Sequence, residues 1–296
     1  MPGNGHCRPS SCSYADYQSQ KQCKNTSFAF YQAVRDQLPV WVLEDMRIME
    51  VLHWEEGGKV SAYSPSEALL YALVHDHQPY ARYLLSQYPQ DALAMPSKNF
   101  SCCQSSAPHL TMAVRYDRLE ILRGILHTLR GFPTSHRAAY INRRGCQRVE
   151  GGKTPLHLAC ELLRAECIVL LLGHGACLWG PDSCGYTPLD ILLQLLRRGE
   201  QDLGLKLQCL DCLLLYLPPG LPFKLRDQLV EEEGLWQGLI GLDLYRWLIG
   251  TSPPSLFTMS MQKVLRSLPP DRFPDALEAL PLPDFLKPLT LIKKKV

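Results

Sequence analysis

A short sequence motif that begins Thr-Pro-Leu occurs twice in this chain, 33 residues apart. It limits the possible fold more than any other feature. Residues Thr154–Ala159 read TPLHLA, and residues Thr187–Leu192 read TPLDIL. In each copy the threonine hydroxyl can cap a helix, and the proline suits the first helical position, which needs no N–H donor. A helix is therefore expected to begin at both sites. Such spacing is typical of a helix–turn–helix unit that buries its apolar face only against neighbouring copies.

The stretch Gly151–Leu193 contains one complete unit. Leu156, Ala159 and Cys160 form a narrow apolar stripe on its first helix. A more apolar second helix follows over residues 167–172, and His174-Gly175 is expected to end it, because glycine readily adopts positive φ. The period and the phrase together resemble the ankyrin repeat. This resemblance implies an all-α fold, an ankyrin-repeat α-solenoid with helical caps and a short C-terminal helical box.

Two earlier segments match the same unit. When the second helices are aligned on their aliphatic pairs, Ala72 and Ala113 fall on the small-residue position of Ala159. These alanines are separated by 41 and 46 residues, so the connecting segments are longer than a bare repeat requires. The chain is therefore predicted to hold about four repeats over residues 64–220, with long inserts at 95–107 and 131–149.

The remaining segments are expected to flank the repeats. Residues 1–24 are rich in Ser, Gln, Gly and Cys and lack an apolar period, which predicts disorder. Helical caps are predicted over residues 25–63 and 221–251, because the terminal repeats of a solenoid are atypical. Residues 252–296 form the last segment, which ends in the basic tail Lys293-Lys294-Lys295.

Composition excludes several classes of function. The chain of 296 residues is 46% hydrophobic and 20% charged, as in an ordinary soluble globular protein. Its net charge of +2 gives no field suited to nucleic acid, and no apolar run approaches the roughly 20 residues that span a bilayer. The first residues lack the apolar core of a secretory signal, so a cytoplasmic protein without membrane insertion is expected. The twelve cysteines would then be reduced thiols.

No residue pattern indicates an enzyme, a cofactor or a metal. Cys209 and Cys212 form a single C-x-x-C on a leucine-rich helix, and a second pair at ligand spacing is missing, so core thiols are expected. Cys102-Cys103 lie in an insert, where a redox or metal role is the minor alternative. The sequence has neither a G-x-S-x-G motif nor a glycine-rich phosphate loop. We expect a protein that catalyses no reaction itself.

Candidate substrate-binding residues lie where solenoids usually present side chains. His75 and His77 flank the turn between two predicted repeat helices, and Arg143 and Arg144 belong to the second insert. Loops that are longer than the fold requires often carry binding residues. The insert is compatible with a solvated surface loop or with a partner contact. These four side chains are the candidates for holding a protein substrate.

The C-terminal segment has a different pattern. Ser252 can cap a helix that Pro253 begins and Pro269-Pro270 ends. Its apolar side chains recur on one side, so the helix needs a partner outside its own short segment. The sequence Leu280–Pro283, LPLP, is expected to be extended, because each proline biases its predecessor away from α geometry. The stripe of the helix comprises Leu256, Met259, Val264 and Leu268, and a second, shorter stripe comprises Phe273, Leu277 and Leu280.

This arrangement resembles the suppressor-of-cytokine-signalling box that follows ankyrin repeats in one family of ubiquitin-ligase substrate receptors. In that box a helix inserts a leucine into a pocket of elongin C. Ser255, Leu256 and Val264 match its pattern, and Ser260 stands where a cysteine is usual. The resemblance implies that elongin B/C binds Ser255, Leu256, Met259, Ser260 and Val264. It also implies that Leu280, Pro281, Leu282 and Pro283 select cullin-5 with its RING partner.

The combined features predict the substrate receptor of a cullin-5 RING ubiquitin ligase. The repeats would hold a protein substrate, and the C-terminal segment would bind elongin B/C and cullin-5. The alternative is a non-catalytic ankyrin scaffold or adaptor without ligase partners. Such a scaffold would contain the same repeats, but its associations would not depend on Leu256.

Overall fold

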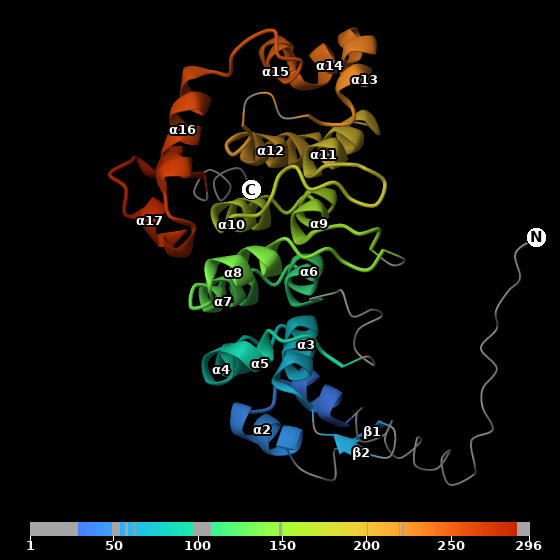
Figure 1. Ribbon diagram of the computed structural model, residues 1–296, viewed down its shortest axis with the longest axis vertical. Coiled ribbons are helices and arrows are strands. Elements are labelled where there is room, and N and C mark those ends of the chain that lie inside the picture. The colour runs from blue at the N-terminus through green and yellow to red at the C-terminus, as the bar shows by residue number, and fades with distance from the viewer. Residues whose placement is uncertain are drawn as a thin grey trace, which may run out of the picture. The chain divides into compact units, whose positions relative to one another are not determined.

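The chain divides into two compact units, residues 1–92 and 93–296, which are described separately (Figure 1). The computed structural model describes residues 29–48, 54–56, 59–61, 63–97, 108–147, 150–199, 201–218, 220 and 222–288. The predictions for residues 1–24, for most of the insert at 95–107 with Cys102-Cys103, and for the basic tail lie outside these residues.

Among its described residues, the first unit contains a helix at residues 29–35 followed by six further helices and strands. Aromatic side chains form its core: the ring of Phe30 is fully buried and stacks on Tyr63 with 4.8 Å between the ring centroids. The elements after the first helix are α2 (Val40–Ile48), β1 (Trp54–Glu56), β2 (Lys59–Ser61), α3 (Pro65–His75), α4 (Gln78–Gln87) and α5 (Pro89–Ala92).

The hairpin of β1 and β2 was not expected, because the sequence predicted only helices between residues 25 and 63. The two strands pair antiparallel, with Glu56 opposite Lys59. Only Gly57-Gly58 separate these two residues in the sequence, and glycine pairs are typical of two-residue hairpin loops. This local turn pattern explains why strands form there.

Helices α3 and α4 form the predicted repeat pair of the first unit. Ser64 caps α3: its hydroxyl accepts from the Glu67 N–H, and the Glu67 carboxylate accepts from the Ser64 N–H at 2.9 Å. Pro65 occupies the first helical position, as the sequence predicted. Asp76, at φ 55°, makes the tight turn into α4. The predicted small residue Ala72 is fully buried.

The second unit consists of helix pairs followed by a helical cap and a C-terminal box. Figure 1 shows the pairs in two layers, and the contacts between neighbouring helices agree. The first layer comprises α6 (Pro108–Arg115), α9 (Pro155–Glu161) and α11 (Pro188–Arg197), and the second comprises α7 (Leu119–Leu129), α10 (Ala165–Gly173) and α12 (Leu203–Leu214). The cap comprises α13 (Arg226–Glu231), α14 (Glu233–Ile240) and α15 (Leu242–Leu248).

The third residue of α9 and of α11 joins each helix to the loop of the following unit. The His157 ring accepts from the Thr154 N–H through Nδ1 at 3.2 Å and donates through Nε2 to the Tyr186 carbonyl at 3.0 Å. The Asp190 carboxylate accepts from the Thr187 N–H and hydroxyl and from the Leu225 N–H at 2.8 Å. One side chain therefore both caps its own helix and positions the next segment.

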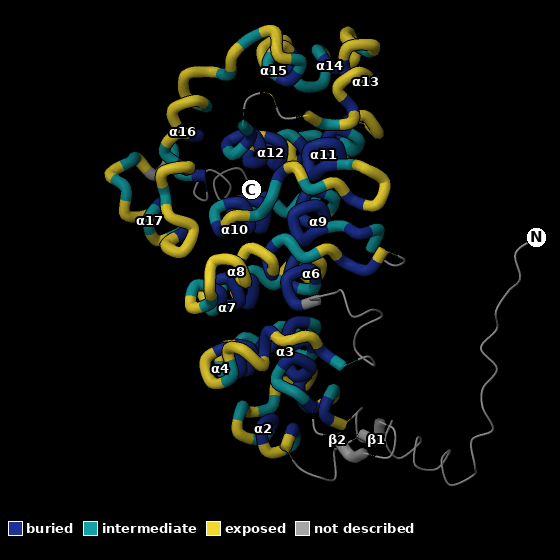
Figure 2. The backbone as a smooth tube through the Cα atoms, viewed as in Figure 1, coloured by how far each residue is buried: buried dark blue, intermediate teal, exposed yellow. Residues whose placement is uncertain are grey.

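Many residues of the repeat helices are buried (Figure 2), and most of these are small or apolar. Ala113 and Ala159 are fully buried, as the repeat alignment predicted. Cys160, Cys167 and Cys209 are buried free thiols. Burial raises the pKa of Cys167 to about 12, which keeps this thiol protonated and unreactive. Cys160, Cys167, Cys209 and Cys212 are therefore core residues, as predicted, whereas Cys184 is exposed.

The insert at 131–149 is not the simple loop that the sequence predicted, because α8 (Thr134–Ile141) lies within it. The Tyr140 hydroxyl lies 3.0 Å from Nδ1 of His109 on α6. The Asn142 side chain accepts from the Cys177 N–H at 2.6 Å, after α10. Buried aromatic and polar contacts thus fix this insert to two repeats.

In the described part of the chain, no helix is both long enough and apolar enough to cross a membrane. The longest helices there have 12 residues, as in α12 and in the C-terminal α16 (Leu256–Ser267). A spanning helix needs about 20 residues.

Replacing Asp190 with alanine should destabilise the second unit. The substitution removes three hydrogen bonds and leaves the buried Thr187 and Leu225 N–H groups without their acceptor. We expect the free energy of unfolding to fall by about 2–4 kcal/mol in urea titrations followed by circular dichroism. The matched control is Asp227→Ala, at an exposed position on α13, with an expected loss below about 1 kcal/mol. Equal losses in the two variants would contradict this role of Asp190.

Candidate functional site

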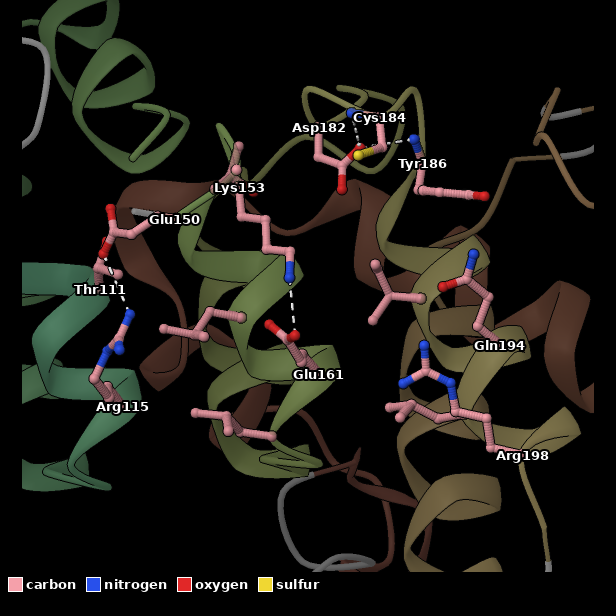
Figure 3. A pocket seen from close by; sticks show the side chains of 16 residues that line it. Thr111, Arg115, Glu150, Lys153, Glu161, Asp182, Cys184, Tyr186, Gln194 and Arg198 are labelled. Atoms are coloured by element: carbon pink, nitrogen blue, oxygen red, sulfur yellow. Dashed lines mark hydrogen bonds and ion pairs between the residues drawn. The ribbon is translucent and has the colours of Figure 1, made fainter. Parts of the chain in front are cut away.

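A groove of about 580 Å³ opens along the first-layer helices α6, α9 and α11 (Figure 3). Its floor is apolar, and its rim carries charged and polar side chains from the helices and from the loops that precede them. The floor includes Leu158, Leu162, Ile191 and Leu195, and the rim includes Arg115, Glu150, Lys153, Glu161, Asp182, Gln194 and Arg198.

Ion pairs and backbone contacts hold most of the rim charges. Lys153 Nζ lies 2.8 Å from a Glu161 carboxylate oxygen, and Arg115 pairs with Glu150 at 3.4 Å. The Asp182 carboxylate accepts from the Cys184 N–H and the Tyr186 N–H, at 2.8 and 2.9 Å. These contacts fix the loops along the groove and leave its surface close to neutral.

Arg198 differs from the other charged groups of the rim. It follows α11 directly, one turn beyond Gln194, and Figure 3 shows both side chains beside the groove. Across the part of the chain that the structure describes, Arg198 forms no ion pair and no side-chain hydrogen bond. A guanidinium and an amide in this position can donate hydrogen bonds to a carboxylate or a peptide carbonyl of a bound segment.

The groove suits binding and shows no catalytic arrangement among its described residues. His157 of α9 is buried and uses both ring nitrogens for the helix cap and the following loop. Burial lowers the pKa of His157 below its usual value, so the ring stays neutral. Within the described ranges, no three His, Cys, Asp or Glu side chains gather closely enough to hold a metal ion.

Sequence reasoning missed the groove residues although the repeat period contained a signal for them. Glu161 and Gln194 are 33 residues apart, and Arg115 precedes Glu161 by 46 residues, which are the spacings between the repeats themselves. These three side chains therefore occupy one equivalent position in three successive repeats. All three line the groove. A charged or polar side chain at the same position of three successive repeats is the sequence signal that indicates the rim of the groove.

The prediction that His77 presents its side chain to a partner is wrong. His77 is only 3% exposed. Its Nε2 lies 2.9 Å from the Leu38 carbonyl, and its Nδ1 accepts from the Tyr80 N–H at 3.2 Å. The ring therefore joins the start of α4 to the end of the preceding segment. His75 is half-buried, with its ring edge against Tyr31 at 4.5 Å between centroids.

The two predicted arginines lie on the surface but outside the groove lining. Arg144 is exposed and Arg143 is half-buried. The Arg143 guanidinium lies 5.8 Å from the centre of the Tyr140 ring, at a distance typical of a cation–π contact. These residues therefore belong to the surface around α8, not to the floor of the repeats.

The C-terminal box begins with α16, which starts three residues later than the sequence predicted. Ser255, not Ser252, caps the helix, and its hydroxyl accepts from the Thr258 N–H at 3.1 Å. The reason is Pro254, because a residue that precedes a proline avoids helical geometry and Pro253 cannot begin the helix. Leu256 is therefore the first residue of α16. The helix ends at Ser267, before Pro269-Pro270, as expected.

One face of α16 is fixed to the end of α12. Met261, Gln262 and Leu265 are buried there. The Gln262 side-chain amide donates to the Leu214 carbonyl at 2.8 Å and to the Leu217 carbonyl at 2.9 Å. These carbonyls belong to the C-terminal end of a helix, where backbone acceptors lack intrahelical partners. The box thus completes the hydrogen bonding of the last repeat.

The predicted elongin-binding residues lie on the opposite side of α16. Leu256 is 78% exposed and Met259 is 39% exposed. Ser255 and Ser260 are exposed and Val264 is half-buried. With 100° between successive helical residues, Leu256, Ser260 and Val264 fall within one sector that faces away from Leu265. The structure therefore leaves this apolar face without a partner in the described chain, and we call it the outer face of α16.

The rest of the box returns along the second layer of the repeats (Figure 1). It comprises η2 (Pro270–Arg272), α17 (Asp275–Glu278) and η3 (Asp284–Leu286). Phe273 is buried against His174, and a Cβ atom at position 173 would clash with its ring, so Gly173 is required there. Arg130 donates to the Phe273 carbonyl and to the Asp275 carboxylate at 2.8 Å.

The predicted cullin-binding motif lies on the surface of the box. Pro281 and Pro283 are exposed, and Leu280 and Leu282 are half-buried. The segment has no regular secondary structure, and the Leu282 N–H donates to the Leu280 carbonyl at 2.7 Å. The Lys287 ammonium group donates to the Glu278 carbonyl at 2.9 Å, which joins the two ends of this segment.

Paired helices stacked in two layers, with capping threonines at the repeat starts, define the ankyrin-repeat class of proteins. No protein-family model matches the chain. The chain is 50% identical over 300 residues to "Ankyrin repeat domain-containing protein 9" of Mus musculus, which covers 93% of this chain and 92% of the mouse protein. It belongs to the ankyrin repeat domain-containing protein 9 family.

A shorter match involves a yeast protein. The chain is 44% identical over 55 residues to "Target of rapamycin complex 2 subunit AVO2" of Saccharomyces cerevisiae. This match covers 19% of the chain and 12% of the yeast protein, so it concerns only a small segment.

The ring of His174 packs against Phe273. His174 should therefore make the docking of the C-terminal box on the repeats sensitive to acid. Burial lowers the pKa of His174 to about 4, with a further decrease from Arg130 and Arg137 that the Leu170 carbonyl and Asp275 partly oppose. The unfolded chain binds a proton near pH 6.5, so the stabilising effect of the neutral ring is complete above that pH and is lost as the pH falls towards 4. We expect up to about 3 kcal/mol from this group.

The comparison is His174→Gln against the unchanged protein, with unfolding free energies measured from pH 7.5 to 4. The variant should lose less stability over this range, because glutamine does not titrate. The same substitution at exposed His136 is the matched control. Parallel profiles for the His174 variant and the unchanged protein would refute this assignment.

Proposed function

We propose that this protein is the substrate receptor of a cullin-5 RING ubiquitin ligase. The observation that carries the proposal is the outer face of α16, where Leu256 is 78% exposed on a helix whose opposite face is fixed to α12. Membership of an ankyrin-repeat family supports the role of the repeats as a binding scaffold. The receptor would catalyse no chemistry and would raise the effective concentration of a bound substrate near the ubiquitin-conjugating enzyme.

Docking of α16 on the repeats favours binding of elongin C by Leu256. Gln262, Met261 and Leu265 hold the helix in place before a partner arrives, so little conformational entropy is lost on binding. A largely exposed leucine gains about 1.5–3 kcal/mol when a partner pocket removes it from water. Insertion of one apolar helix face into a groove is a common mode of peptide recognition.

Ser260 takes the place of the cysteine that the box usually contains. Its hydroxyl is exposed on the outer face, near Leu256 and Val264. When a partner covers this face, the hydroxyl needs a hydrogen-bond acceptor or donor to replace water. We propose that it finds this partner on elongin C or in the carbonyl of the preceding helical turn.

The motif Leu280–Pro283 is proposed to select cullin-5 with its RING partner. Its two prolines are exposed and cannot donate a backbone hydrogen bond, so they present apolar surface without an unsatisfied N–H group. The contacts of Phe273 and Arg130 fix the preceding residues to the repeats. Both proposed ligase-binding surfaces therefore belong to one docked segment.

The groove along α6, α9 and α11 is the proposed site for the protein substrate. Its apolar floor and paired rim charges suit a short polypeptide segment, with Arg198 and Gln194 available for its polar groups. We propose that the exposed Arg144, which follows α8, also contacts the substrate. We propose that substrate binding takes place in the cytosol, where free thiols such as those of the repeats persist.

The second candidate function is a scaffold without ligase partners. The contacts of α16 with α12 favour it, because a docked helix also stabilises the end of a repeat stack. In that case the outer face would have no dedicated partner. The two functions differ in the consequence of removing the Leu256 side chain.

Leu256→Pro should abolish binding of elongin B/C and leave the fold intact. Position 256 is the first residue of α16, where proline is tolerated, and the preceding Ser255 already has the extended ψ of 153° that a following proline requires. We expect recovery of elongin C in a pull-down to fall more than tenfold, with a melting temperature within a few degrees of the unchanged protein.

Two further variants make this experiment decisive. Leu235→Ala removes an exposed apolar side chain of α14, outside the C-terminal box, and should retain binding. Leu265→Ala removes a buried contact with the repeats and should lower the melting temperature. Recovery of elongin C that is unchanged by Leu256→Pro would exclude the receptor and favour the scaffold.

A further inference from the structure

A second groove, of about 940 Å³, runs beside α16, between this helix and the loops that follow α12 and α15. Its walls are apolar at Trp247, Pro253 and Pro254, and two glycines widen it. We call it the lateral groove. Its lining consists of Gly220, Arg226, Trp247, Gly250, Thr251, Ser252, Pro253, Pro254, Met259, Gln262, Lys263 and Arg266.

The lateral groove carries positive charge without a carboxylate in its lining. Arg226, Lys263 and Arg266 are all exposed. Arg226 donates to the Ile249 carbonyl at 2.9 Å, and Arg266 donates to the Leu217 carbonyl at 3.3 Å. These acceptors are neutral, so both guanidinium charges remain uncompensated. Over the residues that the structure describes, Lys263 has no ion pair and no side-chain hydrogen bond.

The lateral groove is continuous with the outer face of α16. At 100° per residue, Lys263 and Arg266 follow Met259 along one side of the helix, between the docked side and the side of Leu256. Met259 belongs both to the outer face and to the groove lining. A protein that covers Leu256 and Met259 would therefore place its adjacent surface over these cations.

We propose that the lateral groove binds an acidic segment of the protein that docks on the outer face of α16. Three cations without a carboxylate select carboxylate side chains, and the arginine fork can bind them with two hydrogen bonds. The apolar walls at Trp247 and the two prolines contact the aliphatic parts of the same segment. This inference rests on the proposed function, under which the docking protein is elongin C.

The expected effect of the groove is mainly on the rate of association. Opposite charges on two binding surfaces accelerate their encounter, and added salt weakens this effect. Dissociation depends more on the buried leucine and its pocket. The lateral groove and Leu256 should therefore differ in which rate constant they control.

The test measures association and dissociation of purified elongin B/C on the full-length protein by biolayer interferometry, in 50 mM and 500 mM salt. Lys263→Glu reverses an exposed charge without removing a hydrogen bond of the described structure. Arg266→Gln removes a charge and keeps a donor for the Leu217 carbonyl. Arg82→Glu, at an exposed position on α4, is the control for net charge.

We expect Lys263→Glu combined with Arg266→Gln to slow association about tenfold in 50 mM salt, with a much smaller effect in 500 mM salt. The dissociation rate constant should change less than threefold, and Arg82→Glu should associate almost as the unchanged protein does. If the groove variants associate like Arg82→Glu while Leu256→Pro abolishes binding, the proposal for the lateral groove is overturned and the receptor function stands. If the unchanged protein does not bind elongin B/C, both proposals fail.

Discussion

The structure of the repeats depends on one recurring interaction. A side chain in the first turn of a helix hydrogen-bonds the backbone of its own capping residue and the backbone of the next unit. His157 and Asp190 each accept from the backbone N–H of their own capping threonine and contact the loop of the next unit. Backbone groups at helix starts have no intrahelical partners, and in the interior they cannot bind water. Satisfying them with a shared side chain couples the start of each helix to the position of its neighbour.

The C-terminal box extends the same principle to the end of the stack. Gln262 donates to the carbonyls of Leu214 and Leu217 at the end of α12 and just after it, and Arg130 donates to the Phe273 carbonyl. The hydrogen bonds lie on the inner side of α16, and the exposed apolar residues lie on the outer side. A stable repeat domain can therefore carry a binding helix in a fixed orientation. This division of faces explains how Leu256 stays exposed on an ordered helix.

Local patterns in the sequence predicted the local structure well. The threonine–proline phrases predicted the helix starts at Thr154 and Thr187, and the matching alanines predicted the buried positions. The start of α16 was misplaced because two possible serine caps precede it, and only the effect of Pro254 on its predecessor separates them. The glycine pair at 57–58 carried a hairpin signal that the helical pattern around it obscured.

Features that depend on distant contacts could not be predicted in this way. His77 occupies a turn that looks exposed, yet its ring is buried because the Leu38 carbonyl, 39 residues earlier, lies against it. The lateral groove joins loops after two separate helices to one side of α16, and no spacing in the sequence reports that arrangement. The groove of the repeats could be predicted only in part, because the repeat period relates Arg115, Glu161 and Gln194 but does not show that their side chains line one groove.

We propose that the outer face of α16 and the groove of the repeats serve different partners. Photo-crosslinking tests this division, with benzoyl-phenylalanine introduced at Ser260 on the outer face or at Leu162 in the groove, and purified elongin B/C added to each full-length variant. We predict a covalent adduct with elongin C from position 260 and none from position 162. An adduct from position 162, or no adduct from position 260, would contradict it.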